Sequence, residues 1–301
     1  MPDEKHAVQR PEAWTVAAGQ AARWVGLAVD LRAPRTWFGP TWALLAGILS
    51  SGALGLDARS LLLVAVAWLA GDPLLGSLVA ISLDAAKARH ECTRPPLAAP
   101  RWSLPYVQPG SPGQRLLDAL AGRAARLQWN WQATEGGAVR WSLLAFMTLV
   151  LGAVAGAWPL LVLLVVVVGL LGVAGSRPLR SREREGLAAA HLLVAWLVGR
   201  GTFAPVDTPA FLIGVGFAAI WYAWTSRPPL LRVLAVAHVL VAGLLAALHA
   251  PLAAGGVLLL AVPLLVLLPE NASNQRSYLR HTQAFLMASM LLAAWGLVWP
   301  L

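Results

Sequence analysis

The stretch that decides the fold is PLLVLLVVVVGLLGVAG (residues 159–175), a run of 17 residues without one charged side chain. Its apolar residues follow one another without the alternation of a half-buried β-strand. Its length approaches the ~20 residues with which an α-helix crosses a hydrocarbon core about 30 Å thick. Similar apolar runs recur from residue 37 to the C-terminus. We therefore expect an all-α protein, a polytopic membrane helix bundle.

Composition supports the same class. The chain of 301 residues is 58% hydrophobic and 12% charged, whereas a soluble domain carries about 25% charged residues. Mean hydropathy is +0.65. The only cysteine, Cys92, excludes an internal disulfide and a cysteine-based zinc site. The polar N-terminus lacks an apolar core beside a cleavage site, so we expect no cleavable signal peptide.

Nine apolar segments are expected to span the membrane. They cover residues 37–54, 60–84, 141–157, 159–175, 187–200, 209–225, 233–249, 252–268 and 283–299. The break between the third and fourth segments is Trp158-Pro159, since proline cannot continue a helix before it and tryptophan favours the interface. We expect an N-terminal segment (1–36) followed by a single transmembrane domain (37–301) with a cap-like loop over residues 85–140.

The basic residues predict the orientation. Of the 23 lysines and arginines, only Arg59 and Arg200 fall on the side opposite to the N-terminus. Because cytoplasmic loops carry the excess of lysine and arginine, we expect a cytoplasmic N-terminus and an external C-terminus. We therefore attribute the net charge of +9 to loops that face an anionic bilayer surface, and we expect no nucleic-acid partner.

Two segments outside the spans have helical amphipathicity. They are EAWTVAAGQAARWVGLAVDL (12–31), in the N-terminal segment, and QRLLDALAGRAARLQW (114–129), in the cap-like loop. Each is either an interfacial helix lying on the bilayer or a surface helix docked on the protein without a role toward lipid.

A carboxylate inside a membrane is costly and commonly marks a functional site. Asp72 lies in the middle of the second span, directly before Pro73, and Asp84 lies at its cytoplasmic end. Asp72 either faces a ligand or helps to satisfy the backbone that Pro73 loosens. Asp84 either belongs to a site or pairs with a neighbouring basic residue at the water interface. These two aspartates are the candidate catalytic residues.

Three histidines also lie in the predicted spans: His191, His238 and His249. Neutral imidazole is a good ligand for a metal or for the magnesium of a pigment. None of the three has a histidine partner four residues further on, so a hydrogen bond within the bundle is the alternative for each.

Three stretches carry a family resemblance: RAPRTWFGPTWALLAGILSSG (32–52), SLDAAKARHECTRPPL (82–97) and SRPLRSREREGLAAAHLLVAWLVGRG (176–201). Together with nine spans and an internal N-terminus, they resemble the UbiA superfamily of membrane prenyltransferases, particularly its naphthoate and chlorophyll-synthase branches. The resemblance implies a UbiA-like bundle with two aspartate-rich motifs. Their Mg²⁺ ions neutralise the diphosphate that leaves the prenyl donor.

Both motifs are degenerate in this chain. If Asp84 ends the first motif, Asn-Asp-x-x-Asp-x-x-x-Asp, the other ligand positions hold Gly76, Ser77 and Ala80. The stretch that corresponds to the second motif, residues 210–233, contains no Asp, Glu or Asn. Basic residues remain at the same mouth of the bundle, and their guanidinium groups are suited to an anionic headgroup or a diphosphate. These candidate anion-binding residues, which are alternatively ordinary cytoplasmic charge, are Lys87, Arg89, Arg94, Arg180, Arg182, Arg227 and Arg232.

Two functions follow. In the first, a UbiA-like protein without Mg²⁺-dependent transfer holds an isoprenoid, quinone or pigment-type lipid, or serves as a scaffold for subunits of a membrane complex. In the second, a divergent enzyme attaches a prenyl chain to an aromatic or tetrapyrrole acceptor. Asp72, Asp84 and Glu91 would then bind one Mg²⁺, with Asp84 and Glu91 as the candidate metal ligands; no cofactor is expected otherwise. A transporter is disfavoured, because Asp72 has no acidic counterpart in the sixth span.

Overall fold

The computed structural model describes residues 34–88, 110–133, 137–176, 179–226, 230–268 and 274–299. These ranges contain helices and no strand, as predicted. In chain order the helices are α2 (Pro34–Leu49), α3 (Ala58–Leu69), η1 (Ala70–Leu74), α4 (Leu75–Ala88), α5 (Pro112–Ala133), α6 (Gly137–Ala155), α7 (Ala157–Ala174), α8 (Ser181–Phe203), α9 (Thr208–Thr225), α10 (Leu231–Ala247), α11 (Pro251–Val266) and α13 (Gln275–Val298).

Each predicted apolar segment overlaps one or more of these helices, and the segment 60–84 covers α3, η1 and α4. Within the described ranges, six helices are long and apolar enough to cross a membrane: Ala58–Lys87, Gly137–Ala155, Ala157–Ala174, Ser181–Phe203, Thr208–Thr225 and Ser277–Val298. The remaining apolar helices are shorter: Gly39–Leu49, Leu231–Ala247 and Pro251–Val266. Large apolar side chains are exposed along α6, α7, α10 and α11, as expected of surfaces that face lipid. The chain therefore has the architecture of an integral membrane protein.

Several helix ends differ from their predicted positions because local hydrogen bonds override hydropathy. The sequence predicts the first span over 37–54, but α2 ends at Leu49. There the hydroxyls of Ser50 and Ser51 donate to the carbonyls of Gly47 and Ile48, both at 2.6 Å. Gly52 then adopts φ +65°, a conformation that glycine reaches without steric cost.

At the start of α8 the difference is in the other direction. The sequence predicts a span that begins at residue 187, yet the helix begins at Ser181. The backbone N–H of Arg180 donates to the Glu183 carboxylate at 2.7 Å. This contact satisfies a helix-end donor, which lets polar residues extend the helix beyond its apolar segment.

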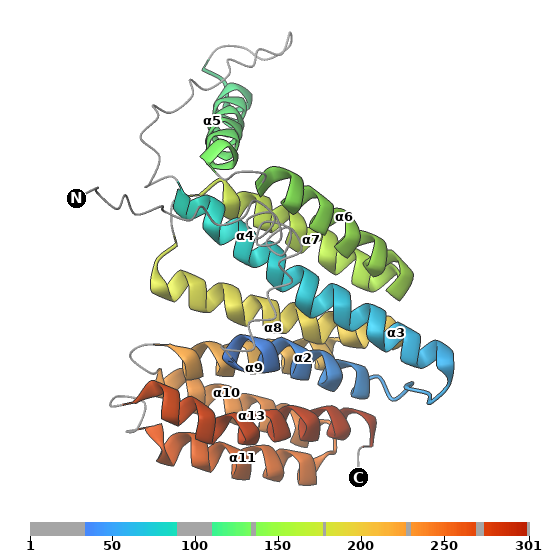
Figure 1. The fold of residues 1–301 in the computed structure, drawn as a ribbon. Coiled ribbons are helices and arrows are strands. Elements are labelled where there is room, and N and C mark those ends of the chain that lie inside the picture. Colours follow the sequence, from blue (N-terminus) through green and yellow to red (C-terminus); the bar gives the residue numbers. More distant parts are fainter. Residues whose placement is uncertain are drawn as a thin grey trace, which may run out of the picture.

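The helices form successive layers (Figure 1). The α6–α7 hairpin covers α3 and α4, α8 lies next, and α2 and α9 lie between α8 and the α10, α11 and α13 group. If α3, η1 and α4 are taken as one rod, consecutive apolar helices run antiparallel, so their connections alternate between the two ends of the bundle. One end receives the α4–α6, α7–α8, α9–α10 and α11–α13 connections, and α5 lies at this end. We call it the basic end, since the described basic residues other than Arg59 and Arg200 lie there.

The closest helix contact joins α2 to α8. A Cβ on Gly47 would collide with the Trp196 carbonyl, and a Cβ on Gly199 would collide with the Leu44 carbonyl. Each glycine follows an alanine by four residues, Ala43 on α2 and Ala195 on α8. This reciprocal small-residue spacing lets two membrane helices approach until their backbones touch. The contact fixes how α2 meets α8 and so positions the polar groups described next.

Candidate functional site

A break in regular helix geometry creates the polar layer at the centre of the bundle. Between α3 and α4 the chain forms a π-helical turn, η1, that contains Pro73. Proline has no N–H and displaces the normal hydrogen-bond ladder, and π-turns are frequent at functional sites. The nearby carbonyls find other donors: His191 Nε2 lies 3.0 Å from the Gly71 oxygen, and the Ser77 hydroxyl donates to the Pro73 oxygen at 2.7 Å.

The carboxylate of Asp72 emerges from this turn into the interior. The residue is 7% exposed, and its Oδ2 accepts a hydrogen bond from the Thr41 hydroxyl of α2. Trp68 Nε1 donates to the same Thr41 oxygen at 3.0 Å. Because that indole N–H can only donate, the single hydroxyl proton of Thr41 is directed to Asp72. The chain Trp68–Thr41–Asp72 therefore holds the carboxylate against α2, where the backbone N–H of Thr41 is a second donor to it.

This geometry bears on the two interpretations of Asp72. The loosened backbone of η1 is satisfied by His191 and Ser77, whereas the side chain of Asp72 is bonded to Thr41 on another helix. The aspartate is thus not required as a partner for the carbonyls of Gly71 and Pro73. A ligand-facing role stays compatible with its position.

The histidines lie in three different settings. His191 is hydrogen-bonded within the bundle, and its Nε2 must carry a proton because a carbonyl oxygen only accepts. His238 is buried, with Nδ1 2.7 Å from the Leu234 oxygen and with Nε2 unpaired among the described residues. His249 is exposed in the α10–α11 connection at φ +60°. Within the ranges that the structure covers, no three His, Cys, Asp or Glu residues form a group that could hold a metal ion.

Most of the candidate anion-binding residues lie at the basic end. Asp84 and Lys87 are exposed near the end of α4. Arg180 and Arg182 at the start of α8, and Arg232 at the start of α10, are exposed as well. The other predicted residues, Arg89, Glu91, Arg94 and Arg227, lie outside the described ranges, as does the predicted amphipathic helix at 12–31. The amphipathic helix predicted at 114–129 is present as α5.

The two candidate catalytic aspartates are far apart. Asp72 and Asp84 lie on one continuous helical rod, Ala58–Lys87, which includes the η1 turn. Twelve residues at 1.5 Å each separate them by roughly 18 Å along the axis, whereas Mg²⁺ binds its oxygen ligands at about 2.1 Å. One ion cannot contact both carboxylates. The single-Mg²⁺ arrangement that the divergent-enzyme hypothesis requires is therefore not formed by this pair.

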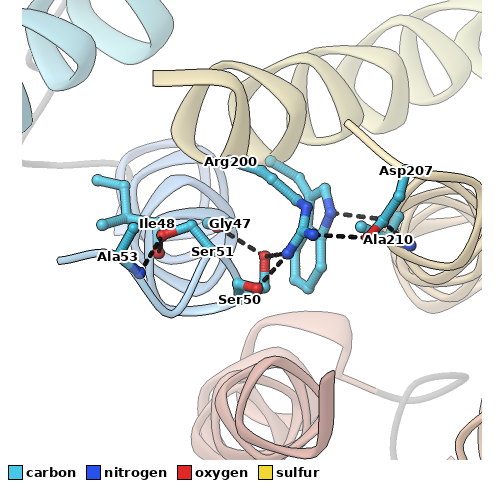
Figure 2. Close-up of polar contacts among 9 residues, drawn as sticks. Gly47, Ile48, Ser50, Ser51, Ala53, Arg200, Asp207 and Ala210 are labelled. Atoms are coloured by element: carbon cyan, nitrogen blue, oxygen red, sulfur yellow. Dashed lines mark hydrogen bonds and ion pairs between the residues drawn. The ribbon is translucent and has the colours of Figure 1, made fainter. Parts of the chain in front are cut away.

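At the opposite end, the structure reveals an ion pair that the sequence analysis did not single out. Figure 2 shows Arg200 of α8 reaching between Ser50, after α2, and Asp207, before α9. Arg200 Nη2 lies 2.7 Å from Asp207 Oδ2, and Nη1 donates to the backbone oxygen of Ser50. Asp207 also caps α9 by accepting from the Ala210 N–H at 3.0 Å. The signal available in the sequence is that Arg200 and Asp207 lie at the two ends of the same short connection between predicted spans.

Comparisons of the chain with protein-family models, with curated proteins and with solved structures find no match. The function is therefore argued from the geometry and chemistry of the chain's own residues.

Proposed function

We propose that the chain is a nine-span membrane protein that holds an isoprenoid-type lipid among its helices and does not transfer it. The arrangement around Asp72 carries this proposal. Its buried carboxylate is held by Thr41, and because a carboxylate has about four lone-pair sites it can accept a further hydrogen bond in this largely apolar interior. Such an acceptor suits the hydroxyl of a prenyl alcohol or a quinol, whose tail the surrounding apolar side chains would accommodate.

The proposal keeps the UbiA-like topology expected from the sequence but excludes Mg²⁺-dependent prenyl transfer. Three features support this choice. The stretch at 210–233 has no Asp, Glu or Asn, the first motif has Gly76 and Ala80 at ligand positions, and the separation of Asp72 from Asp84 prevents shared coordination. A role as a scaffold for a membrane complex is compatible with the same architecture.

The direct test is extraction of lipids from protein purified in mild detergent, followed by mass spectrometry. We expect one isoprenoid lipid to co-purify with the wild-type chain. Asp72→Asn should retain roughly tenfold less, because a hydrogen bond to a charged group contributes about 1.5 kcal/mol. The matched control is Asp84→Asn, which neutralises an exposed carboxylate on the same rod. If the protein purified from several hosts contains no isoprenoid, the proposal is refuted. If the protein converts a labelled prenyl diphosphate into a product, the enzymatic function replaces the proposal.

The proposed topology places the N-terminus and the basic end in the cytoplasm and the C-terminus outside. The single cysteine gives a test without engineering, since Cys92 lies in the loop after the second predicted span. A membrane-impermeant maleimide should label Cys92 only after the membrane is permeabilised. Labelling in intact cells would reverse the orientation.

A further inference from the structure

A cleft separates the amphipathic helix α5 from the last turns of α7. Its volume is about 600 Å³, within the range of small-ligand sites. Glycines open it: a Cβ on Gly172 would meet no atom within 4 Å. At Gly175 the two helices come closer, since a Cβ there would lie 3.7 Å from the Leu127 Cβ of α5. The lining residues are Arg123, Ala124, Arg126, Leu127, Leu171, Gly172, Gly175 and Ser176.

Two positive charges line this cleft. Arg123 and Arg126 are exposed on α5 and, being three residues apart, share one face of the helix. Neither guanidinium has a hydrogen bond or an ion pair with any described residue. The nearest acid on α5, Asp118, lies more than one turn before Arg123, and its Oδ1 accepts from Gln114 Nε2 at 2.8 Å. The cleft thus combines unneutralised donors with the apolar side chains of Leu127 and Leu171.

An apolar stripe leads from the membrane surface of α7 into the cleft. Leu161, Val165 and Val168 are exposed at 52%, 65% and 60%. At 3.6 residues per turn they share one face with Gly172, which opens the cleft. An acyl chain lying along this stripe would bring its headgroup to the two arginines. A soluble anion would gain nothing from the stripe.

We propose that this cleft binds one anionic glycerophospholipid, with its phosphate on Arg123 and Arg126 and an acyl chain along Leu161, Val165 and Val168. Arginine forms bidentate hydrogen bonds with phosphate oxygens, and basic pockets beside membrane helices suit anionic lipids of the cytoplasmic leaflet. The C-terminal partial negative charge of α7 opposes an anion and by itself attracts the arginines. The test must therefore separate lipid binding from simple docking of α5 on α7.

The experiment is native mass spectrometry of the full chain released from nanodiscs of phosphatidylglycerol and phosphatidylcholine in equal amounts. We expect one phosphatidylglycerol to be retained in preference to phosphatidylcholine. The double variant Arg123→Ala/Arg126→Ala should lose at least tenfold of this preference. The matched control, Arg115→Ala, removes an exposed arginine of the same helix that does not line the cleft, and should behave like the wild type.

A second variant leaves both arginines in place. Gly172→Leu has room for its side chain but fills the cleft, so it should abolish retention while the protein stays folded. If Gly172→Leu or the double alanine variant retains phosphatidylglycerol as the wild type does, the arginines serve only to dock α5 and the proposal is overturned. Displacement of the lipid by an equal concentration of soluble glycerol phosphate would equally overturn it, in favour of a site for free phosphate esters.

The inference uses the orientation proposed above but not the role of Asp72. Its readout is a phospholipid, whereas the proposed function is tested by an isoprenoid. If only the isoprenoid is absent, the proposed function has failed. If only the phospholipid is not retained, the proposal for the cleft has failed.

Discussion

Replacing Asp207 by alanine tests whether the Arg200 ion pair joins α8 to α9. The change removes two contacts: the cap on the Ala210 N–H and the pairing with Arg200 Nη2. Loss of a helix cap costs about 1 kcal/mol. Breaking a fully buried pair costs about 3–5 kcal/mol, but an exposed pair contributes only about 0.2–1 kcal/mol.

The geometry places this pair between those limits. The Arg200 side chain is 10% exposed and that of Asp207 is 50% exposed, so water reaches the carboxylate. Arg200 also keeps its bond to the Ser50 oxygen when Asp207 is lost. We therefore expect the pairing to contribute about 1 kcal/mol and Asp207→Ala to cost about 2 kcal/mol in all. Asp207→Asn retains an oxygen for the cap and should cost about half as much.

The assay is thermal unfolding in detergent, followed by the loss of helical signal and of monodisperse protein. The matched control is Asp57→Ala. Asp57 caps α3 at the same end of the bundle, where it accepts from the Ser60 N–H at 3.2 Å. No ion pair of Asp57 is present among the described residues. Asp207→Ala should lower the midpoint clearly more than Asp57→Ala does. Equal shifts for the two variants would refute the reasoning, because Arg200 would then contribute nothing beyond the cap.

Three further predictions follow from named contacts. Gly47→Val and Gly199→Val should each destabilise the protein by about 1–3 kcal/mol or more through overpacking. The control is Gly243→Val, which should be tolerated in the same thermal assay because a Cβ there meets nothing within 4 Å. Equal behaviour of all three variants would contradict the close α2–α8 contact. Thr41→Val removes the hydroxyl that donates to Asp72 and should cost about 1–3 kcal/mol. Thr41→Ser should restore both stability and isoprenoid retention. A harmless valine would exclude the hydrogen bond from the Thr41 hydroxyl to Asp72. The hydrogen bonds from Ser60 lower the pKa of Asp57. Its capping stability is therefore present above the unfolded pKa and is lost as pH falls through the folded pKa. Amide protection factors at the start of α3, corrected for the intrinsic pH dependence of exchange, should fall on acidification, and Ser60→Ala should weaken this dependence.

Hydropathy and charge were sufficient to locate the apolar helices. The run at 159–175 coincides closely with α7, Ala157–Ala174, and the predicted amphipathic segment at 114–129 is contained in α5. Helix ends were less predictable, because hydroxyl bonds after Leu49 and the Arg180–Glu183 contact act independently of hydropathy. The resemblance to the UbiA superfamily stays a prediction.

By itself the sequence determined that the chain is helical, that it is apolar over lengths that cross a bilayer, and that its positive charge gathers between particular helices. Each of these is a property of a continuous segment, since both helix period and span length are local. The tertiary structure alone decided that Thr41 meets Asp72, 31 residues away, and that Arg200 meets Ser50, 150 residues away. Such partners depend on the rotation and depth at which helices pack, and the backbone contact of Gly47 and Gly199 sets both for α2 and α8. That packing converts an isolated aspartate into a carboxylate held by Thr41 of another helix.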